Sequence, residues 1–351
     1  MTELTKLNQV RHGGDLTKAI EIYGGEKSDW LDLSTGISPW AYPIPRITEE
    51  LWRTLPEPST DLEKVAAEYY SCNQSDIAVL PGSQLAIRLL PTLIERPQTV
   101  AIPWRGYQEH KQAWQLAGHS TVFYKTIDEL LQLVHTKQVY NAVLINPNNP
   151  TGELANAKQI EQISNEILGL LVVDEAFIDT TPNLSTVNRN LAPNILIFRS
   201  IGKFFGLAGA RVGVAISLHP INRALQRLFT PWSVSAPSQY IAQIALADLD
   251  WQQQQRERIL KQSKEVELGM QAFTNCFKEH SIKVKTCGLF TTLFAKDIFI
   301  EDLHTQLAKQ KIWTRVGDKA QGNNWLRFSL PGDSLERFQC QIESALRRFI
   351  D

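Results

Sequence analysis

The chain has 351 residues, of which 43% are hydrophobic and 21% are charged, and its formal net charge is −1. This length and composition are typical of a soluble globular protein with a large and a small domain. A net charge so close to zero gives no reason to expect a nucleic acid or an anionic membrane as a partner.

The first segment, residues 1–40, is marked by Gly and Pro and predicts an extended stretch of chain rather than a domain. It begins with MTELTKLNQVRHGG, which lacks the apolar run of a signal peptide, and no window of the chain is long and apolar enough to span a bilayer. The four cysteines have no CxxC spacing, so we expect neither a metal site nor a disulfide framework. These features favour a cytoplasmic protein.

Residues 41–238 predict a large α/β domain. Short apolar runs alternate with helical patterns, and the strand candidates are DIAVLPG, TVAIP, STVFYK, NAVLINP, LGLLVVDEAF, NILIFRS and RVGVAIS. Strands that are apolar throughout and separated by helices indicate a mainly parallel, seven-stranded type of sheet covered by helices. Ligands of such sheets bind at the carboxyl ends of the strands, where Asn146 to Asn149, Asp174, Ser200 and Lys203 gather.

Residues 239–351 predict a small C-terminal α+β domain. A helical run extends from about Gln239 to His280 and is followed by the short strand candidates IKVKT, TTLFAK, KIWTRVG and NWLRFSL. Further helices are expected near residues 300–310 and from about Asp333.

The lysine in SIGKFFGLAGARVG, Lys203, lies in a predicted loop between two buried strands, where a stable ammonium is costly unless it is used. It could clamp a phosphate, act as a general base or condense with an aldehyde. A P-loop is excluded because no GxxxxGK[ST] surrounds it, and a nicotinamide-dependent reductase is disfavoured because no GxGxxG opens a helix after a strand.

The residues around this lysine favour pyridoxal 5′-phosphate (PLP), which needs a lysine, an acid against its pyridine nitrogen, phosphate donors and a flat partner for its ring. Asp174 ends the strand LLVVD and is the candidate acid, although a helix-capping Asp is equally common there. Asn149 follows the strand AVLIN in the turn NPNNPTG and could donate to the cofactor's phenolic oxygen.

Candidate phosphate donors lie between a strand and a helix at Gly82, Ser83 and Gln84, although an ordinary helix N-cap fits the same residues. Ser200 and Arg211 would complete the phosphate cradle. Tyr107, in RGYQEH, is the candidate for stacking on the ring, although a lone Tyr is more often part of a core.

Three motifs together, NPNNPTG, VVDEAF and SIGKFFGLAGARVG, resemble the fold-type I PLP enzymes of the class I/II aminotransferase superfamily over nearly the whole chain. The resemblance implies an α/β PLP-dependent transferase fold with a large domain, a small C-terminal domain and a homodimer that builds its sites at the subunit interface.

The segments HGGDLTKAIEIYG and WLDLSTGISP, with YQEHKQAW and the Ser200-x-Gly-Lys203 spacing, resemble the threonine-phosphate decarboxylases of cobalamin biosynthesis, a branch close to histidinol-phosphate aminotransferases. Phe177, a further cofactor-binding candidate, stands where the tyrosine of DEAY is usual in the aminotransferases. Leu55 replaces a tyrosine that would reach a partner's cofactor phosphate. Gly36 is a further substrate-binding candidate in this segment, although it stands where some decarboxylases have Asn, so that side-chain contact is absent here.

The resemblance implies that Arg327 in NWLRFSL binds the substrate carboxylate, although a surface ion pair is the plainer interpretation. His12 in the HGG segment is a candidate for the substrate's phosphate, and Arg337 is a weaker one. The activity implied is decarboxylation of O-phospho-L-threonine to (R)-1-aminopropan-2-ol O-phosphate. A histidinol-phosphate-type aminotransferase using 2-oxoglutarate stays open. A non-catalytic PLP-binding regulator is disfavoured because the short N-terminal segment leaves no room for a DNA-binding domain.

Overall fold

The computed structural model describes residues 12–187, 191–274, 282–317 and 324–347. The chain divides into two compact units: a large unit of residues 37–262 and 287–289, and a small unit of residues 1–36, 263–286 and 290–351. The C-terminal division lies inside a helix, whereas the sequence predicts it near residue 238, and the predicted domain limits stay a prediction. No helix within the described ranges is long and apolar enough to cross a membrane.

The large unit contains a seven-stranded sheet in the order β2-β8-β7-β6-β5-β3-β4. Its strands are β2 (Ile77–Leu80), β3 (Thr99–Pro103), β4 (Ser120–Tyr124), β5 (Asn141–Ile145), β6 (Leu171–Asp174), β7 (Ile195–Ser200) and β8 (Gly213–Ile216). Each lies within one of the predicted apolar runs. All pairs are parallel except those of β8, which is antiparallel to β2 and β7. The sheet is therefore mixed but mainly parallel, and the α/β fold expected from the sequence is confirmed.

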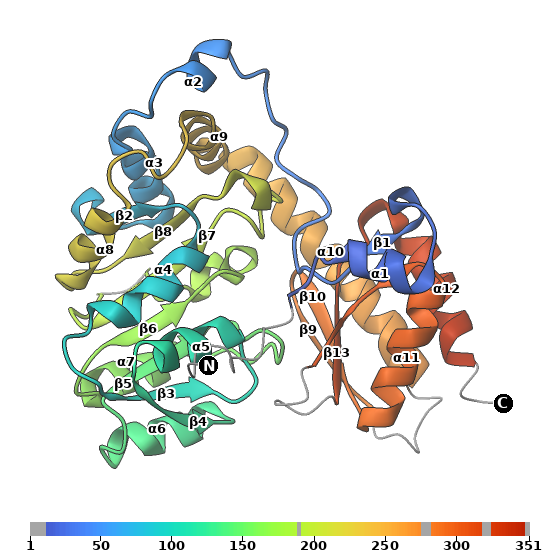
Figure 1. Cartoon of the computed structure of the whole chain (residues 1–351). Coiled ribbons are helices and arrows are strands. Elements are labelled where there is room, and N and C mark those ends of the chain that lie inside the picture. The colour runs from blue at the N-terminus through green and yellow to red at the C-terminus, as the bar shows by residue number, and fades with distance from the viewer. Residues whose placement is uncertain (1–11, 188–190, 275–281, 318–323, 348–351) are drawn as a thin grey trace, which may run out of the picture. The chain divides into compact units, whose positions relative to one another are not determined.

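Both faces of this sheet are covered by helices (Figure 1). The helices of this unit are α2 (Glu49–Arg53), α3 (Thr60–Tyr70), α4 (Ser83–Leu89), α5 (Gln108–Leu116), α6 (Ile127–His135), α7 (Ala157–Glu166), α8 (Ile221–Phe229) and α9 (Ala236–Ala247). Local signals set some of their ends. For example, the side chains of Asn156 and Gln159 form a capping box that starts α7.

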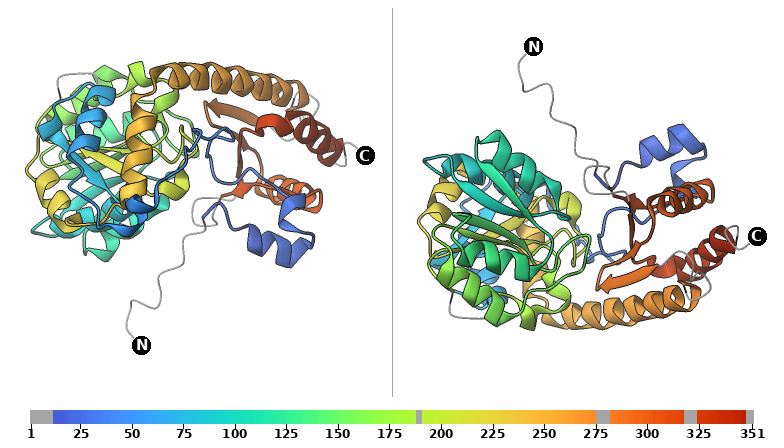
Figure 2. Two further views of the ribbon diagram at one scale, coloured as in Figure 1. Left: turned by 90° about the horizontal axis from the view of Figure 1, so that it is seen from above. Right: turned by 90° about the horizontal axis from the view of Figure 1, so that it is seen from below.

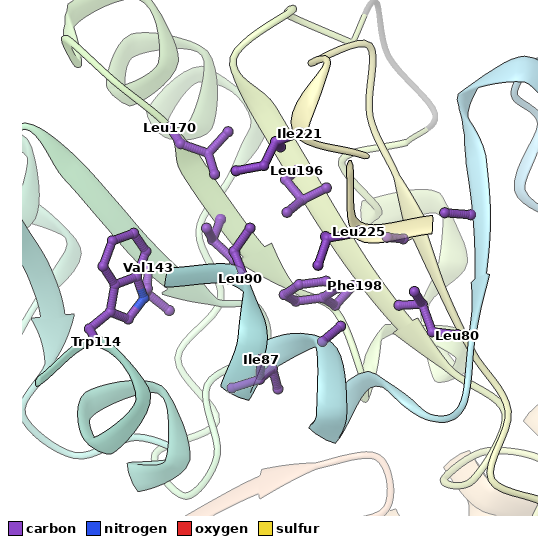
Figure 3. Close-up of a cluster of buried hydrophobic side chains, with 14 of the residues drawn as sticks. Leu80, Ile87, Leu90, Trp114, Val143, Leu170, Leu196, Phe198, Ile221 and Leu225 are labelled. Carbon is purple, nitrogen blue, oxygen red and sulfur yellow. The ribbon is translucent and has the colours of Figure 1, made fainter. Parts of the chain in front are cut away.

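The main core lies between one face of the sheet and α4, α5 and α8. Side chains with a period of two along the strands, such as Val143 and Phe198, meet Leu90, Trp114 and Leu225 from the covering segments (Figure 3). The alternate strand residues are buried as well, so these strands are apolar throughout, as parallel strands covered on both faces require. The burial holds the strand ends rigidly in place.

One residue separates the end of α9 from helix α10 (Leu249–Thr274). Helix α10 is continuous, and the division between the two units falls within it (Figure 2). The single-residue break at Asp248 agrees with the helical run predicted from Gln239. The end of that predicted run, near His280, lies outside the described residues.

The small unit contains a four-stranded sheet in the order β12-β13-β10-β9 and a parallel pair of β1 and β11. Its strands are β1 (Leu31–Asp32), β9 (Lys283–Cys287), β10 (Phe290–Phe294), β11 (Ile312–Trp313), β12 (Arg315–Val316) and β13 (Trp325–Ser329), and its helices include α11 (Asp297–Lys309) and α12 (Leu335–Arg347).

The N-terminal segment is not extended throughout, contrary to the prediction. Helix α1 (Leu16–Tyr23) forms because the Asp15 side chain accepts a hydrogen bond from the Lys18 N–H at its start. Its apolar residues pack against Trp30 and Trp313 of the same unit, which supplies the burial that a short helix needs.

Candidate active site

A cavity of about 200 Å³ lies in the large unit, where the chain leaves β2, β3, β5, β6 and β7 and enters β8. All the cofactor-binding residues predicted from the sequence line it. The lining residues are Gly82, Ser83, Gln84, Ile87, Tyr107, Ile145, Asn149, Asp174, Ala176, Phe177, Ser200, Lys203 and Arg211. The fold thus brings these positions together at the carboxyl edge of the sheet, while the role of each side chain stays a prediction.

The acidic residue of the cavity, Asp174, is buried at the end of β6. Its Oδ1 accepts a hydrogen bond from the Ala176 N–H at 3.1 Å, and its Oδ2 lies 3.0 Å from Nε2 of His110, which is also buried. A carboxylate oxygen accepts hydrogen bonds, so the Nε2 at this distance carries the proton and donates to it. The sequence interpretation missed His110, whose signal was its place three residues after Tyr107, the N-cap residue of α5.

The amine of the cavity belongs to Lys203, which is half-buried in the loop between β7 and β8. Its Nζ lies 5.5 Å from the ring centroid of Phe177. Its backbone carbonyl accepts hydrogen bonds from the N–H groups of Ser38 at 3.0 Å and Gly206 at 3.3 Å. The backbone that carries this amine is thus held by a distant part of the chain.

Another side of the cavity is formed by glycines at positions where a side chain would not fit. Gly82 has φ +80°, and a Cβ atom there would lie 2.7 Å from Nη2 of Arg211. A Cβ at Gly213 would lie 2.6 Å from the backbone nitrogen of Ser83. Glycine at these two places keeps the guanidinium of Arg211 and the first turn of α4 within reach of one anion.

The tyrosine of the cavity, Tyr107, uses its hydroxyl to donate a hydrogen bond to Oε1 of Gln84. Burial, with the carboxylates of Glu109 and Asp174 nearby, raises the pKa of this hydroxyl above its ordinary value of 10. The hydroxyl therefore stays protonated at neutral pH and fixes the ring. The predicted stacking of this ring on a cofactor stays a prediction.

Behind the cavity lies a buried ion cluster that the sequence interpretation missed. Arg199 directly precedes Ser200, and Glu175 directly follows Asp174, but neither of them lines the cavity. Arg199 Nη1 lies 3.1 Å from Glu175 Oε2, and its Nη2 pairs with Asp179. This cluster joins the ends of β6 and β7, which carry two of the cavity residues.

The four predicted substrate-binding residues belong to the small unit. Arg327 is buried in β13, donates to the Ser34 carbonyl and packs over the ring of Phe290 at 5.6 Å. Burial and the neighbouring cation of Arg315, its cross-strand partner on β12, lower the pKa of Arg327 to about 9, while Asp32 acts in the opposite direction. Arg315 was not considered in the sequence interpretation.

The other three substrate candidates differ in burial. Gly36 is buried with φ +71°, and its N–H donates to the Ser329 hydroxyl at 2.7 Å. His12 and Arg337 are exposed, and Arg337 on α12 donates to the Asp29 carbonyl at 2.5 Å. These contacts show Gly36 in a structural position, and they leave the substrate roles of all three as predictions.

The residues of the cavity fit PLP. They supply one amine, one buried carboxylate held by a histidine, and a glycine-lined anion site beside an arginine. Within the described residues no group of three or more His, Cys, Asp or Glu side chains is arranged to hold a metal ion.

Comparisons with known proteins agree with this fit. The threonine-phosphate decarboxylase of Pseudomonas aeruginosa is 36% identical over 344 residues, which cover 97% of this chain and 98% of that protein. The histidinol-phosphate aminotransferase of Ruminiclostridium cellulolyticum is 26% identical over 69% of this chain and 73% of that protein.

Among solved structures, the histidinol-phosphate aminotransferase of Sinorhizobium meliloti in complex with pyridoxal-5′-phosphate superposes with a TM-score of 0.84 at 20% identity, covering 99% of this chain and 98% of that one. At that identity the likeness establishes the fold. The model of the family "Aminotransferase class I and II" matches residues 48–340. This chain therefore belongs to the aminotransferase class I and II family.

Proposed function

We propose that this chain is a PLP-dependent carboxy-lyase that converts O-phospho-L-threonine to (R)-1-aminopropan-2-ol O-phosphate, the linker of the cobalamin nucleotide loop. The observation that carries the proposal is the single cavity that joins the amine of Lys203 to the histidine-held carboxylate of Asp174. The choice of decarboxylation follows the relative that is 36% identical over nearly the full length of both chains.

When bound, PLP supplies an electron-poor ring that accepts the electron pair of a bond broken at the substrate α-carbon. Lys203 would provide the amine that holds the cofactor and would return a proton to the α-carbon after CO2 leaves. The carboxylate of Asp174, held by His110, would face the ring nitrogen of bound PLP and favour its protonated form.

The remaining cavity residues orient and bind. Arg211 and Ser200, with the backbone at Gly82 and Ser83, bind the cofactor phosphate, and Asn149 donates to the phenolic oxygen. Tyr107 and Phe177 would pack against the cofactor's ring. These assignments use only residues that line one cavity, and each can be tested by substitution.

In the small unit we assign Arg327 to the substrate carboxylate, because a guanidinium holds a carboxylate by two parallel hydrogen bonds and so fixes its direction. That direction decides the reaction. Decarboxylation requires the Cα–carboxylate bond to stand perpendicular to the ring, whereas transamination requires the Cα–H bond there. His12 and Arg337 stay candidates for the substrate phosphate.

A histidinol-phosphate-type aminotransferase is the second candidate, and the similarity to the relative that is 26% identical supports it. It would need 2-oxoglutarate as a second substrate and would convert the cofactor to its amine form in a first half-reaction. The two reactions therefore give different products and leave the cofactor in different chemical forms.

The test uses the purified protein with PLP and O-phospho-L-threonine in the absence of any keto acid. Repeated release of CO2, with return of the visible absorbance of the lysine-bound cofactor, is expected. Loss of that absorbance without CO2, reversed by 2-oxoglutarate, would establish the aminotransferase instead.

The control for the amine is a pair of lysine variants. Lys203→Ala should lose the visible absorbance and more than about three orders of magnitude in rate. Lys111→Ala, which removes a half-buried lysine over the Phe123 ring in the same unit, should retain both.

We further propose a cytoplasmic homodimer. The support for a dimer is the exposure of large apolar side chains of the large unit, with Trp52 67% and Leu55 64% exposed. Sedimentation equilibrium on the purified protein tests the dimer, and a mass of one chain at micromolar concentration would exclude it.

A further inference from the structure

The backbone around Lys203 is held by a distant segment, residues 37–42, which we call the strap. The Ser38 N–H donates to the carbonyl of Lys203 at 3.0 Å, and the Tyr42 N–H donates to the carbonyl of Phe205 at 2.8 Å. Gly206 allows this close approach, since it has φ +67° and a Cβ atom there would lie 2.6 Å from the Cα of Ala41. The strap therefore lies directly against the backbone of the loop that carries the amine.

One side chain joins the strap to this loop. Gln255 of α10 is fully buried, and the two hydrogens of its Nε2 are shared among three acceptors: the Phe204 carbonyl at 2.8 Å, the Trp40 carbonyl at 2.9 Å and the Ser38 hydroxyl at 2.8 Å. Two of these three partners are carbonyls, which only accept hydrogen bonds, so the nitrogen of the amide has to face them. The amide thus bridges the residue next to Lys203 and two strap residues.

A buried glutamine at position 255 has an unfavourable free-energy contribution that an apolar side chain would not have. Within the part of the chain that the structure describes, Oε1 of Gln255 has no hydrogen-bond partner. A buried acceptor left without a donor is unfavourable, and an apolar side chain of the same size would avoid that cost if it only filled space. We therefore attribute the presence of an amide at this position to the hydrogen bonds that Nε2 donates.

A second glutamine one turn earlier in α10 provides a comparison. Gln252 is also buried, and its Nε2 donates to the carbonyls of Ala245 at 2.9 Å and Leu246 at 3.0 Å. These carbonyls belong to the end of α9, so Gln252 secures the joint between two helices and does not contact the Lys203 loop or the strap in any of these bonds.

We propose that Gln255 is a positioning residue for the reactive amine: it acts through the Phe204 carbonyl and the strap to hold the backbone of Lys203 in one place. The proposal rests on the proposed function of Lys203. A reactive group has to be held to within a fraction of an ångström for efficient chemistry. Without the amide, the buried Phe204 carbonyl loses this donor and the Trp40 carbonyl keeps only the Ser38 hydroxyl at 3.0 Å, so the loop and the strap separate more readily.

The first test measures hydrogen–deuterium exchange on cofactor-free Gln255→Met and Gln252→Met proteins. Methionine keeps the size of glutamine and removes its donors. Exchange of the Ser38 and Tyr42 amides should be roughly tenfold faster in Gln255→Met than in the wild type. It should remain at the wild-type rate in Gln252→Met, where any faster exchange is confined to the α9–α10 joint.

The second readout separates positioning from loss of structure. With PLP bound, the pH midpoint of the visible absorbance of the lysine-bound cofactor should shift in Gln255→Met and not in Gln252→Met. The rate kcat should fall roughly tenfold or more in Gln255→Met with KM nearly unchanged. A purely structural loss would lower the amount of active protein without moving the pH midpoint.

Equal exchange rates and equal pH midpoints in the two methionine variants would overturn the proposal. If Gln255→Met does not fold, Ser38→Ala removes one of the three acceptors and should give a smaller change of the same kind, and no change there would also overturn it. A wild-type protein that shows neither lysine-bound cofactor nor CO2 release would instead refute the proposed function, whatever the exchange data show.

Discussion

Arg199 in the large unit and Arg327 in the small unit are both buried, yet their surroundings shift the two guanidinium pKa values in opposite directions. Burial alone lowers the pKa of Arg199, but the carboxylate of Asp179, followed by Tyr70 and Glu175, raises it above its ordinary value. Burial lowers the pKa of Arg327 to about 9, and the nearby cation of Arg315 lowers it further.

The opposite pKa shifts indicate that Arg199 is a structural cation, whereas Arg327 is suited to binding an anionic ligand. The negative charges that stabilise Arg199 are folded in with it, so its charge is used inside the protein. The guanidinium of Arg327 donates to a neutral carbonyl and has a cation as its cross-strand neighbour, so an arriving anion would stabilise it. Four predictions test this comparison.

The largest effect is expected on stability in the large unit. Arg199→Met leaves the carboxylates of Glu175 and Asp179 buried beside each other, and should lower the free energy of unfolding by about 3–5 kcal/mol in urea titration. Adding Glu175→Gln and Asp179→Asn to the same protein should restore most of the loss. A decrease below about 1 kcal/mol for the single variant would mean that the cluster is not the stabilising element described here.

The corresponding change in the small unit should affect binding instead. Arg327→Met should raise KM for O-phospho-L-threonine roughly 100-fold, equivalent to about 2–3 kcal/mol, because a charge-assisted pair with the ligand is lost. The free energy of unfolding should stay equal or increase, since a buried charge is removed. Arg347→Met, which removes an exposed arginine of α12 that pairs with Glu343, is the control and should change neither quantity by more than a few tenths of a kcal/mol. Loss of stability with an unchanged KM would reverse the comparison.

A smaller effect is expected at the carboxylate next to the ion cluster. His110→Phe keeps a ring of similar shape but removes the Nε2 that lies 3.0 Å from Asp174. A hydrogen bond to a charged group is worth about 1.5–3 kcal/mol, so kcat should fall roughly ten- to a hundredfold. His119→Phe removes another buried histidine, whose Nε2 lies 3.0 Å from the Pro91 carbonyl, and should leave kcat unchanged. Equal rates in the two variants would exclude the assigned role of His110.

The smallest effect is a pH dependence that belongs to Arg327. Ligand binding needs the charged guanidinium, so the Kd for O-phospho-L-threonine should rise about tenfold between roughly pH 8 and 10. Calorimetry on Lys203→Ala avoids the titration of that lysine, and Arg327→Met should show no such rise.

The free energy of unfolding should change with pH in the opposite direction: it should increase where ligand binding weakens. The folded pKa of about 9 lies below the ordinary 12.5, so the unfolded chain binds more protons in this window and stability rises with pH.

Local patterns were sufficient to predict much of the fold. Each strand of the large sheet lies in a predicted apolar run, because parallel strands buried on both faces must be apolar along their whole length. Local patterns were less reliable where burial comes from distant residues. Helix α1 was predicted as extended chain because its apolar residues find their partners, such as Trp313, far along the sequence.

The candidate site divides in the same way. The sequence by itself determined which residues gather in the cavity, such as Asp174, Asn149 and Lys203, because each directly follows a buried strand and the fold class brings strand ends to one edge. Only the tertiary structure decided what holds them: His110 against Asp174, and Gln255 with the strap against the backbone of Lys203. Such contacts join residues that are tens to hundreds of positions apart, and a hydrogen bond depends on distances of a few tenths of an ångström that no residue pattern records.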